Sequence, residues 1–207
     1  MTRGKRPILH REELRLRILK MAMRAFFAKG IKAVKMDDIA QALAISKRTL
    51  YETYNNKEEL LLEGLKYLED LSDMHMIHYS QDPRHNVMDI LIEFYHMQIN
   101  HLAIISPLFF AEMEKYKRVV AYLDKKHKER DGKKHDFFER GIREGFFRSD
   151  INYRIVTEIG RASVEYAMKT QMYKLHTLQD MFRNLIFLFI RGICTQKGLD
   201  ELEKGTK

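Results

Sequence analysis

The sequence predicts an all-α protein with a short N-terminal three-helix head and a larger C-terminal helical bundle. Apolar residues recur at the spacing of one helix face along most of the chain, and no convincing alternating strand pattern occurs. The 207 residues include only three prolines and no tryptophan, while good helix formers are abundant. Positive charge is concentrated at one end, since residues 1–60 hold 14 Lys and Arg against 7 Asp and Glu, and the remainder holds 23 against 22. These three observations predict a basic head on a nearly neutral helical body.

The head begins with a helix that is predicted over about 11–29. Its apolar residues fall on one face, and Gly30 is placed to end it as a C-cap. A short second helix is predicted around 36–43 and a third around 47–54, with the Ser46 hydroxyl capping the third. Their inward positions are Ile39, Ala40, Leu43, Leu50 and Tyr54. Two short helices joined by such a turn form a helix-turn-helix.

The body is predicted to be helical throughout. A fourth helix starts at Asn56, which with Glu59 has the spacing of a capping box, and continues towards His78. Asp82-Pro83 and Ser106-Pro107 both read as helix starts. The remaining elements are predicted as a helix from Pro83 to about 105, a short helix after Ser106, a charged helix over 115–145 with a break at Asp131-Gly132 left open, a loop over 147–152, and helices over 153–174 and 177–196, the last capped by Thr177 with Asp180.

The basic head favours a partner of dense negative charge, and a nucleic-acid backbone fits best. A membrane surface is the alternative, weakened because the cations are not set against an unusually apolar face. The single cysteine, Cys194, excludes an internal disulfide and is interpreted as a small core residue. The N-terminus lacks a signal peptide, and the apolar run over 185–190 is too short to span a bilayer. We therefore expect a cytoplasmic protein.

The outward face of the third helix carries the candidate recognition residues. Lys47, Arg48, Thr49, Glu52 and Thr53 offer donors and acceptors that can reach base edges and phosphates in a major groove. The alternative is a generic helical hairpin with a solvated basic face. The agreement of charge, caps and ordered motif favours the DNA-binding interpretation.

This stretch resembles the head of the tetracycline-repressor-like (TetR) regulators. The resemblance covers about residues 11–62 and rests on Phe26-x-x-x-Gly30, Ile39-Ala40, and the ordered run from Ser46 to Leu60, in which Tyr54 takes the place of a Phe. It implies a DNA-binding domain over 1–56 and a ligand-binding and dimerisation domain over 57–207. Thr49, Tyr51 and Lys57 would hold phosphates, while Lys47 and Arg48 would lie at or near base edges. The full set of DNA-contacting residues expected on this basis is Lys35, Met36, Lys47, Arg48, Thr49, Tyr51, Tyr54 and Lys57, with an arm of Arg3, Lys5 and Arg6 that reaches a minor groove or is a flexible tail.

Three positions depart from the family pattern. Lys35 stands where a capping Thr or Ser is usual, so that cap must come from elsewhere. Ala44 replaces the usual turn glycine, which costs roughly 1 kcal/mol if the position needs a positive φ. Arg48 replaces a commonly small residue. The departures leave the motif intact, but the operator sequence does not follow by analogy.

The resemblance also implies a homodimer on a palindromic double-stranded operator and an unknown small, largely apolar effector that releases a repressor. The expected dimer interface comprises Ile159, Phe182, Leu185, Ile186, Phe189 and Ile190. The expected pocket lining comprises Tyr95, His96, Phe109, Phe110, Met113, Tyr122, Phe138 and Tyr166. Aromatic and Met residues suit an adaptable apolar pocket, although each one alone is more typical of plain core. No membrane partner is expected.

Two other function classes are weighed. Glu93-x-x-His96 and Asp124-x-x-His127 have the i, i+3 spacing of di-iron helix bundles, but such a site needs two Glu-x-x-His pairs and two further glutamates in one core, and Asp124 and His127 lie in a run of lysines typical of an exposed face. We therefore expect no metal or other cofactor, and no enzyme, since no nucleophile arrangement or phosphate loop occurs. The second class is a basic helical interaction module, or a nonspecific DNA-binding protein without ligand control.

Overall fold

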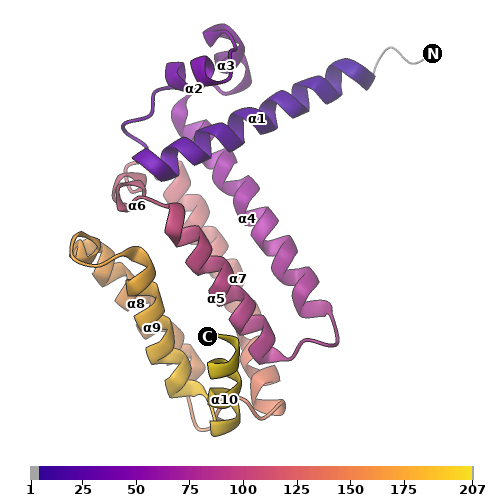
Figure 1. Ribbon diagram of the computed structural model, residues 1–207, viewed down its shortest axis with the longest axis vertical. Coiled ribbons are helices and arrows are strands. Elements are labelled where there is room, and N and C mark those ends of the chain that lie inside the picture. Colours follow the sequence, from indigo (N-terminus) through magenta and orange to yellow (C-terminus); the bar gives the residue numbers. More distant parts are fainter. Residues whose placement is uncertain (1–4, 207) are drawn as a thin grey trace. The chain divides into compact units, whose positions relative to one another are not determined.

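The computed structural model describes residues 5–206, with the backbone alone for 5–10, 131 and 133. The described residues are helical, apart from turns and a single bridge between Phe147 and Cys194, so the predicted all-α class is confirmed. The elements, of which Figure 1 labels the α-helices, are in chain order α1 (Lys5–Lys29), α2 (Met36–Ala42), α3 (Lys47–Thr53), α4 (Lys57–Gln81), α5 (Val87–Ile104), α6 (Pro107–Met113), α7 (Lys117–Arg143), α8 (Tyr153–Lys169), the 3₁₀ turn η1 (Met172–Lys174), α9 (Leu178–Ile193) and α10 (Gln196–Gly205).

The chain divides into two compact units. The first contains the described residues up to Leu71 together with Ile105–Asp124, and the second contains Ser72–Ile104 and the described residues from Lys125 onward. Phe109 and Val119 are buried with the head residues Ile18, Phe26 and Leu50. The compact unit around the head is therefore larger than the predicted domain over 1–56. It takes in the first turns of α4, all of α6 and the first turns of α7.

Several helix starts differ from the predictions. α1 begins at Lys5, six residues before the expected start, and Pro7 lies in its first turn, where a missing N–H is tolerated. α5 begins at Val87 rather than at Pro83. The Asn86 side chain accepts from the N–H groups of Met88 (2.7 Å) and Asp89 (3.1 Å), and the Asp89 carboxylate accepts from Asn86 N–H (2.8 Å). Asn86 is therefore the cap of this helix.

Asp82, the expected cap, instead pairs with Arg84 through hydrogen bonds of 2.6–3.1 Å. At α4, Asn56 caps as predicted, because Glu59 N–H donates to its side chain at 2.9 Å. The reciprocal half of the box differs, since the Glu59 carboxylate accepts from Asn55. Thr177 caps α9 as predicted, accepting from Asp180 N–H at 3.0 Å.

The C-terminal elements also contain corrections. α7 is continuous through Asp131-Gly132, and α8 ends at Lys169 rather than near 174. An unpredicted helix, α10, follows α9, with Thr195 capping it through Gly198 N–H (3.3 Å). Cys194 is buried, and desolvation raises the pKa of its thiol to about 11, which fits the expected core role.

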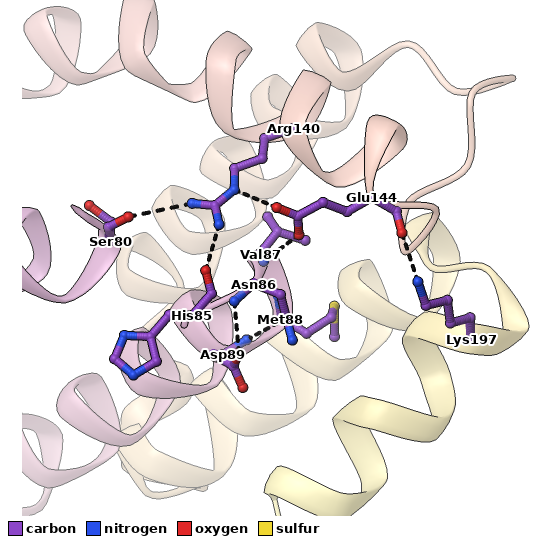
Figure 2. Close-up of polar contacts among 9 residues, drawn as sticks. All are labelled: Ser80, His85, Asn86, Val87, Met88, Asp89, Arg140, Glu144 and Lys197. Atoms are coloured by element: carbon purple, nitrogen blue, oxygen red, sulfur yellow. Dashed lines mark hydrogen bonds and ion pairs between the residues drawn. The ribbon is translucent and has the colours of Figure 1, made fainter. Parts of the chain in front are cut away.

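Arg140 of α7 joins the end of α4 and the start of α5 within the second unit (Figure 2). Its guanidinium donates to the carbonyls of Ser80 (3.4 Å) and His85 (2.5 Å) and to Glu144 Oε1 (2.5 Å). Glu144 Oε2 in turn accepts from Val87 N–H at 2.7 Å, and the Glu144 carbonyl accepts from Lys197 Nζ at 2.8 Å. The network therefore holds the first peptide of α5 and the first turn of α10 to the last turn of α7.

A helix that spans a bilayer needs about 20 consecutive, mostly apolar residues, and the described helices fall short of this combination of length and apolarity. This agrees with the short apolar runs in the sequence.

Candidate DNA-binding interface

The turn between α2 and α3 is built from local hydrogen bonds and one shared core. Ser46 Oγ accepts from Thr49 N–H at 3.0 Å, as the sequence predicts for the cap of α3. Ile45 N–H donates to the Ala40 carbonyl at 3.0 Å, which closes the turn. Ile39, Ala40 and Leu50 are buried against α1 and α4. The packing fixes α3 on α2 and leaves the opposite face of α3 in solvent.

Ala44 lies in the left-handed region, with φ of 52°. A Cβ in this region contacts the following carbonyl, which costs roughly 1 kcal/mol relative to glycine. The condition stated from the sequence, that position 44 needs a positive φ, is therefore met.

We predict that Ala44→Gly stabilises the head by up to about 1 kcal/mol, because glycine adopts this φ without a steric penalty. Chemical denaturation of the wild type and the variant, analysed at equal m-value, measures the difference. Ala42→Gly, at the end of α2 in ordinary helical geometry, is the control and is expected to destabilise. If Ala44→Gly destabilised the protein, the left-handed conformation of Ala44 would not be a source of strain.

Lys35 provides no side-chain cap for α2, and only the reciprocal half of a capping box is present, from Asp38. Lys35 N–H donates to Asp38 Oδ2 at 3.0 Å, and a lysine side chain has no acceptor to offer in return. Asp37 and Asp38 both lie in the first turn of α2, where negative charge is stabilised by the helix dipole. Asp38 therefore satisfies the backbone N–H of Lys35 and adds favourable charge to the first turn, while the side-chain cap itself stays absent.

The outward face of α3 carries charged pairs rather than free cations. Lys47 Nζ lies 2.5 Å from Asp37 Oδ2 of α2, and Arg48 Nε lies 2.7 Å from Glu52 Oε1. The hydrogen bonds and charges of these carboxylates raise the pKa of Lys47 and of Arg48. The Arg48 side chain is 87% exposed and Tyr51 is 46% exposed. These side chains are available to a ligand on this face, whereas Thr49 is half-buried and its hydroxyl is hydrogen-bonded to Ser46 Oγ at 2.8 Å.

Three expected DNA contacts need correction or reassignment. Tyr54 and Met36 are only 1% and 6% exposed and belong to the core of the first unit, so their side chains cannot contact DNA. The Tyr54 hydroxyl has no hydrogen-bond partner among the described residues, and the Arg15 guanidinium lies over its ring at 4.8 Å. The helix-period pattern already places Tyr54 inward, since it follows Leu50 at i+4, and only the resemblance places it among the DNA contacts.

Lys57 is the third. Its ammonium donates to the carbonyls of Ile31 (2.9 Å) and Lys32 (3.5 Å), and burial lowers its pKa. In this structure Lys57 therefore joins the start of α4 to the loop between α1 and α2. Lys35 is exposed, and the arm residue Arg3 lies outside the described residues, as do the side chains of Lys5 and Arg6.

The expected pocket residues do not form one cluster within a unit. Phe109, Phe110, Met113 and Tyr122 belong to the first unit, where Phe109 makes edge contacts with Phe27 and Phe110. In the second unit, Tyr95 is buried and stacks on Phe187, and Phe138 stacks on Tyr153. His96 Nε2 is bonded to the Gly205 carbonyl (2.9 Å), and Tyr166 is 64% exposed. Most of these residues therefore pack as core.

The expected dimer residues divide between core and surface. Ile190 is 4% exposed and belongs to the core of the second unit, whereas Phe182 and Ile186 are half-buried, with the Phe182 ring stacked on Tyr95 and Ile186 packed on the same core. Leu185 and Phe189 are half-buried. Exposed apolar side chains do occur on the two helices, at Ile155, Ile159, Val164 and Tyr166 of α8 and at Leu188 of α9, which is 71% exposed.

The helix-turn-helix segment is similar in sequence to a family of known proteins. Residues 18–63 match the family model described as "Bacterial regulatory proteins, tetR family". No curated protein matches the chain in sequence.

Solved structures share the fold at low sequence identity. A proposed transcriptional regulator from Saccharomonospora viridis in complex with choline is 18% identical over 89% of this chain and 100% of its own, with a TM-score of 0.70. A tetR-family transcriptional regulator from Agrobacterium tumefaciens is 16% identical over the same shares, also with a TM-score of 0.70. The regulator FadR from Bacillus subtilis in complex with stearoyl-CoA is 16% identical over 86% of this chain and 98% of its own, with a TM-score of 0.60.

Proposed function

We propose that this chain, a DNA-binding transcriptional regulator of the tetR family of bacterial regulatory proteins, acts as a homodimeric repressor that a small, largely apolar ligand releases from a palindromic operator. The observation that carries the DNA-binding part is the helix-turn-helix itself. Its core is closed by Leu50 and Ile39, and its outward face presents Arg48, Thr49 and Tyr51.

The homodimer is supported by the apolar surface of α8 and α9. These helices pack on each other, with Gly160 of α8 close to Phe189 of α9. α8 has no buried residue in the single chain, although Ile155, Ile159 and Tyr166 recur along one of its faces. A second copy that covers this surface would form a four-helix bundle. It would also supply the second recognition helix that a palindromic site requires.

Ligand control is supported by the relatives with bound molecules, choline in one and stearoyl-CoA in another. We propose a small molecule with a substantial apolar part for this chain, because its second unit is rich in aromatic side chains. Tyr95 and Phe138 remain candidates for contact with it, through rotamer changes of their stacked partners.

The proposed route from ligand to DNA runs along α4. Its first turns supply Leu60 and Leu61 to the core of the head, and the same helix continues to Gln81 in the second unit. Two further contacts join the head to the 105–124 segment: Lys32 N–H donates to Glu112 (2.6 Å), and Arg118 N–H donates to Glu58 (3.1 Å). A ligand that binds one position of these helices better than another would change the spacing of the two heads.

Selection of bound sequences from random duplex DNA at moderate salt tests the proposal. We expect the wild type to enrich a palindromic site and the Arg48→Ala, Tyr51→Ala double variant to lose that enrichment, because both side chains lie on the outward face of α3. Binding that only weakens with salt, without enrichment, would favour the alternative of a nonspecific basic helical protein. Equal operator binding with and without a saturating effector would contradict ligand control.

A further inference from the structure

We propose that Asp37 and Glu52 are specificity-determining residues, which pair with the two cations of α3 in the free protein and so keep this helix from binding phosphates at random sequences. The inference rests on the DNA-binding function of the head. It concerns a property that the basic composition of the head conceals, namely that its recognition face is electrically balanced.

The balance follows from two ion pairs. α3 contains two cations, Lys47 and Arg48, and one acid, Glu52. Lys47 Nζ lies 2.5 Å from Asp37 of α2, and Arg48 Nε lies 2.7 Å from Glu52 one helical turn away. Both cations of α3 therefore have a carboxylate partner, and all four side chains are between 46% and 87% exposed.

The excess positive charge of the head lies elsewhere. Arg17, Lys20 and Arg24 of α1 are exposed and recur at a spacing of three and four residues, which places them on one helix face. Within the described part of the chain these three side chains make no ion pair. Long-range attraction to a phosphate backbone, which carries no sequence information, is therefore assigned to α1 rather than to α3.

The paired carboxylates make the recognition helix selective. At a random sequence, Arg48 exchanges Glu52 for a phosphate. The exchange gains little binding free energy, because it leaves the Glu52 carboxylate unpaired beside the negatively charged DNA backbone. At a matching site a bidentate arginine contact with guanine N7 and O6 is worth about 1–3 kcal/mol of discrimination. An exposed ion pair is worth only about 0–1 kcal/mol, so guanine can displace Glu52. The freed carboxylate can also accept from the amino group of a cytosine.

The test measures affinity for random-sequence duplex DNA over a salt series, by fluorescence anisotropy of the full-length protein. Glu52→Gln keeps the size of the side chain and removes its charge. Glu201→Gln is the matched control, because it makes the same change in net charge and frees Lys204 from a similar exposed pair on α10, outside the head. Thermal unfolding checks that both variants are folded.

We expect Glu52→Gln to bind random duplex about three- to ten-fold more tightly at low salt, with the log–log salt slope steeper by about one per protomer. Asp37→Asn is expected to act in the same direction through Lys47. Glu201→Gln is expected to match the wild type. In Glu52→Gln the ratio of the affinity for the selected site to the affinity for random DNA falls, because the affinity for random DNA rises.

Equal effects of Glu52→Gln and Glu201→Gln would overturn the inference, since net charge alone would then explain them. Unchanged random-site affinity combined with a lost preference at one base pair would also overturn it, and would make Glu52 a base-reading residue only. A wild type that binds no duplex at all would instead refute the DNA-binding function on which the inference depends.

Discussion

Replacing Leu188 with glutamate is expected to leave the protein folded but monomeric, and to lower its affinity for the selected operator by about 10²-fold or more. Leu188 is 71% exposed in the single chain, so a charge there costs the fold little. In a dimer formed through α8 and α9, the same charge would be buried without a partner. A monomer presents one recognition helix and loses the gain from binding two half-sites together. Light scattering gives the mass, and anisotropy gives the affinity.

The matched control is Met74→Glu on α4, another exposed apolar side chain of the second unit, at 59%. It is expected to remain dimeric and to bind the operator as the wild type does. If Leu188→Glu remains dimeric at low micromolar concentration while the fold is intact, α9 is not part of the dimer interface at this residue, and the proposed four-helix bundle is wrong.

The second large effect is expected at Arg140. Arg140→Met should destabilise the second unit by about 2–4 kcal/mol, because it leaves the Ser80 and His85 carbonyls and the Glu144 carboxylate without their shared donor. Methionine preserves most of the apolar stem, so the loss reports the guanidinium contacts drawn in Figure 2. Urea denaturation followed by circular dichroism measures the change.

Arg143→Met provides the comparison, since Arg143 is exposed in the same last turn of α7. It is expected to change the free energy of unfolding by no more than about 0.5 kcal/mol. Hydrogen exchange adds a local readout: in Arg140→Met the amides at the start of α5 should lose protection before those of α1. Equal stability of the two variants would show that the network around Arg140 is energetically neutral.

The head was predictable because its structure is encoded in neighbouring residues. Ser46 caps α3 by accepting from the N–H three residues ahead, Gly30 has a φ of 81° at the end of α1, and Ala44 takes the positive φ expected of a turn glycine. Each of these features is set by contacts within about five residues. A sequence pattern can therefore predict them without knowledge of the tertiary fold.

The second unit was less predictable because its helix ends depend on distant residues. Asp82-Pro83 and Asn86 offer competing start signals for α5, and Glu144, 57 residues away, accepts from Val87 N–H at the actual start. α10 contains two glycines, which lower its helix propensity. It is held by buried Leu202 and by Gly205, where a Cβ would lie 2.4 Å from Ile92.

The face of α3 that carries the candidate recognition residues was predictable in its position, and its ion pairs were predictable only in part. The outward positions of α3 follow from helix periodicity, but the pairing of Lys47 with Asp37 joins two helices and depends on the turn geometry. The Arg48 and Glu52 pair has the i, i+4 spacing of helix ion pairs and could have been recognised. Lys57 binds backbone carbonyls of a loop 25 residues earlier, which no local pattern indicates.

The two-segment composition of the first unit limits how its helix-turn-helix can be grafted onto another protein. A graft that exchanges residues 1–56 alone would separate Phe26 and Ile18 from Phe109 and Val119, which share one core with them. It would also break the junction between Lys32 and Glu112. A chimera that joins this head to a foreign sensor should therefore carry 105–124 as well, or redesign the apolar surface that those residues cover.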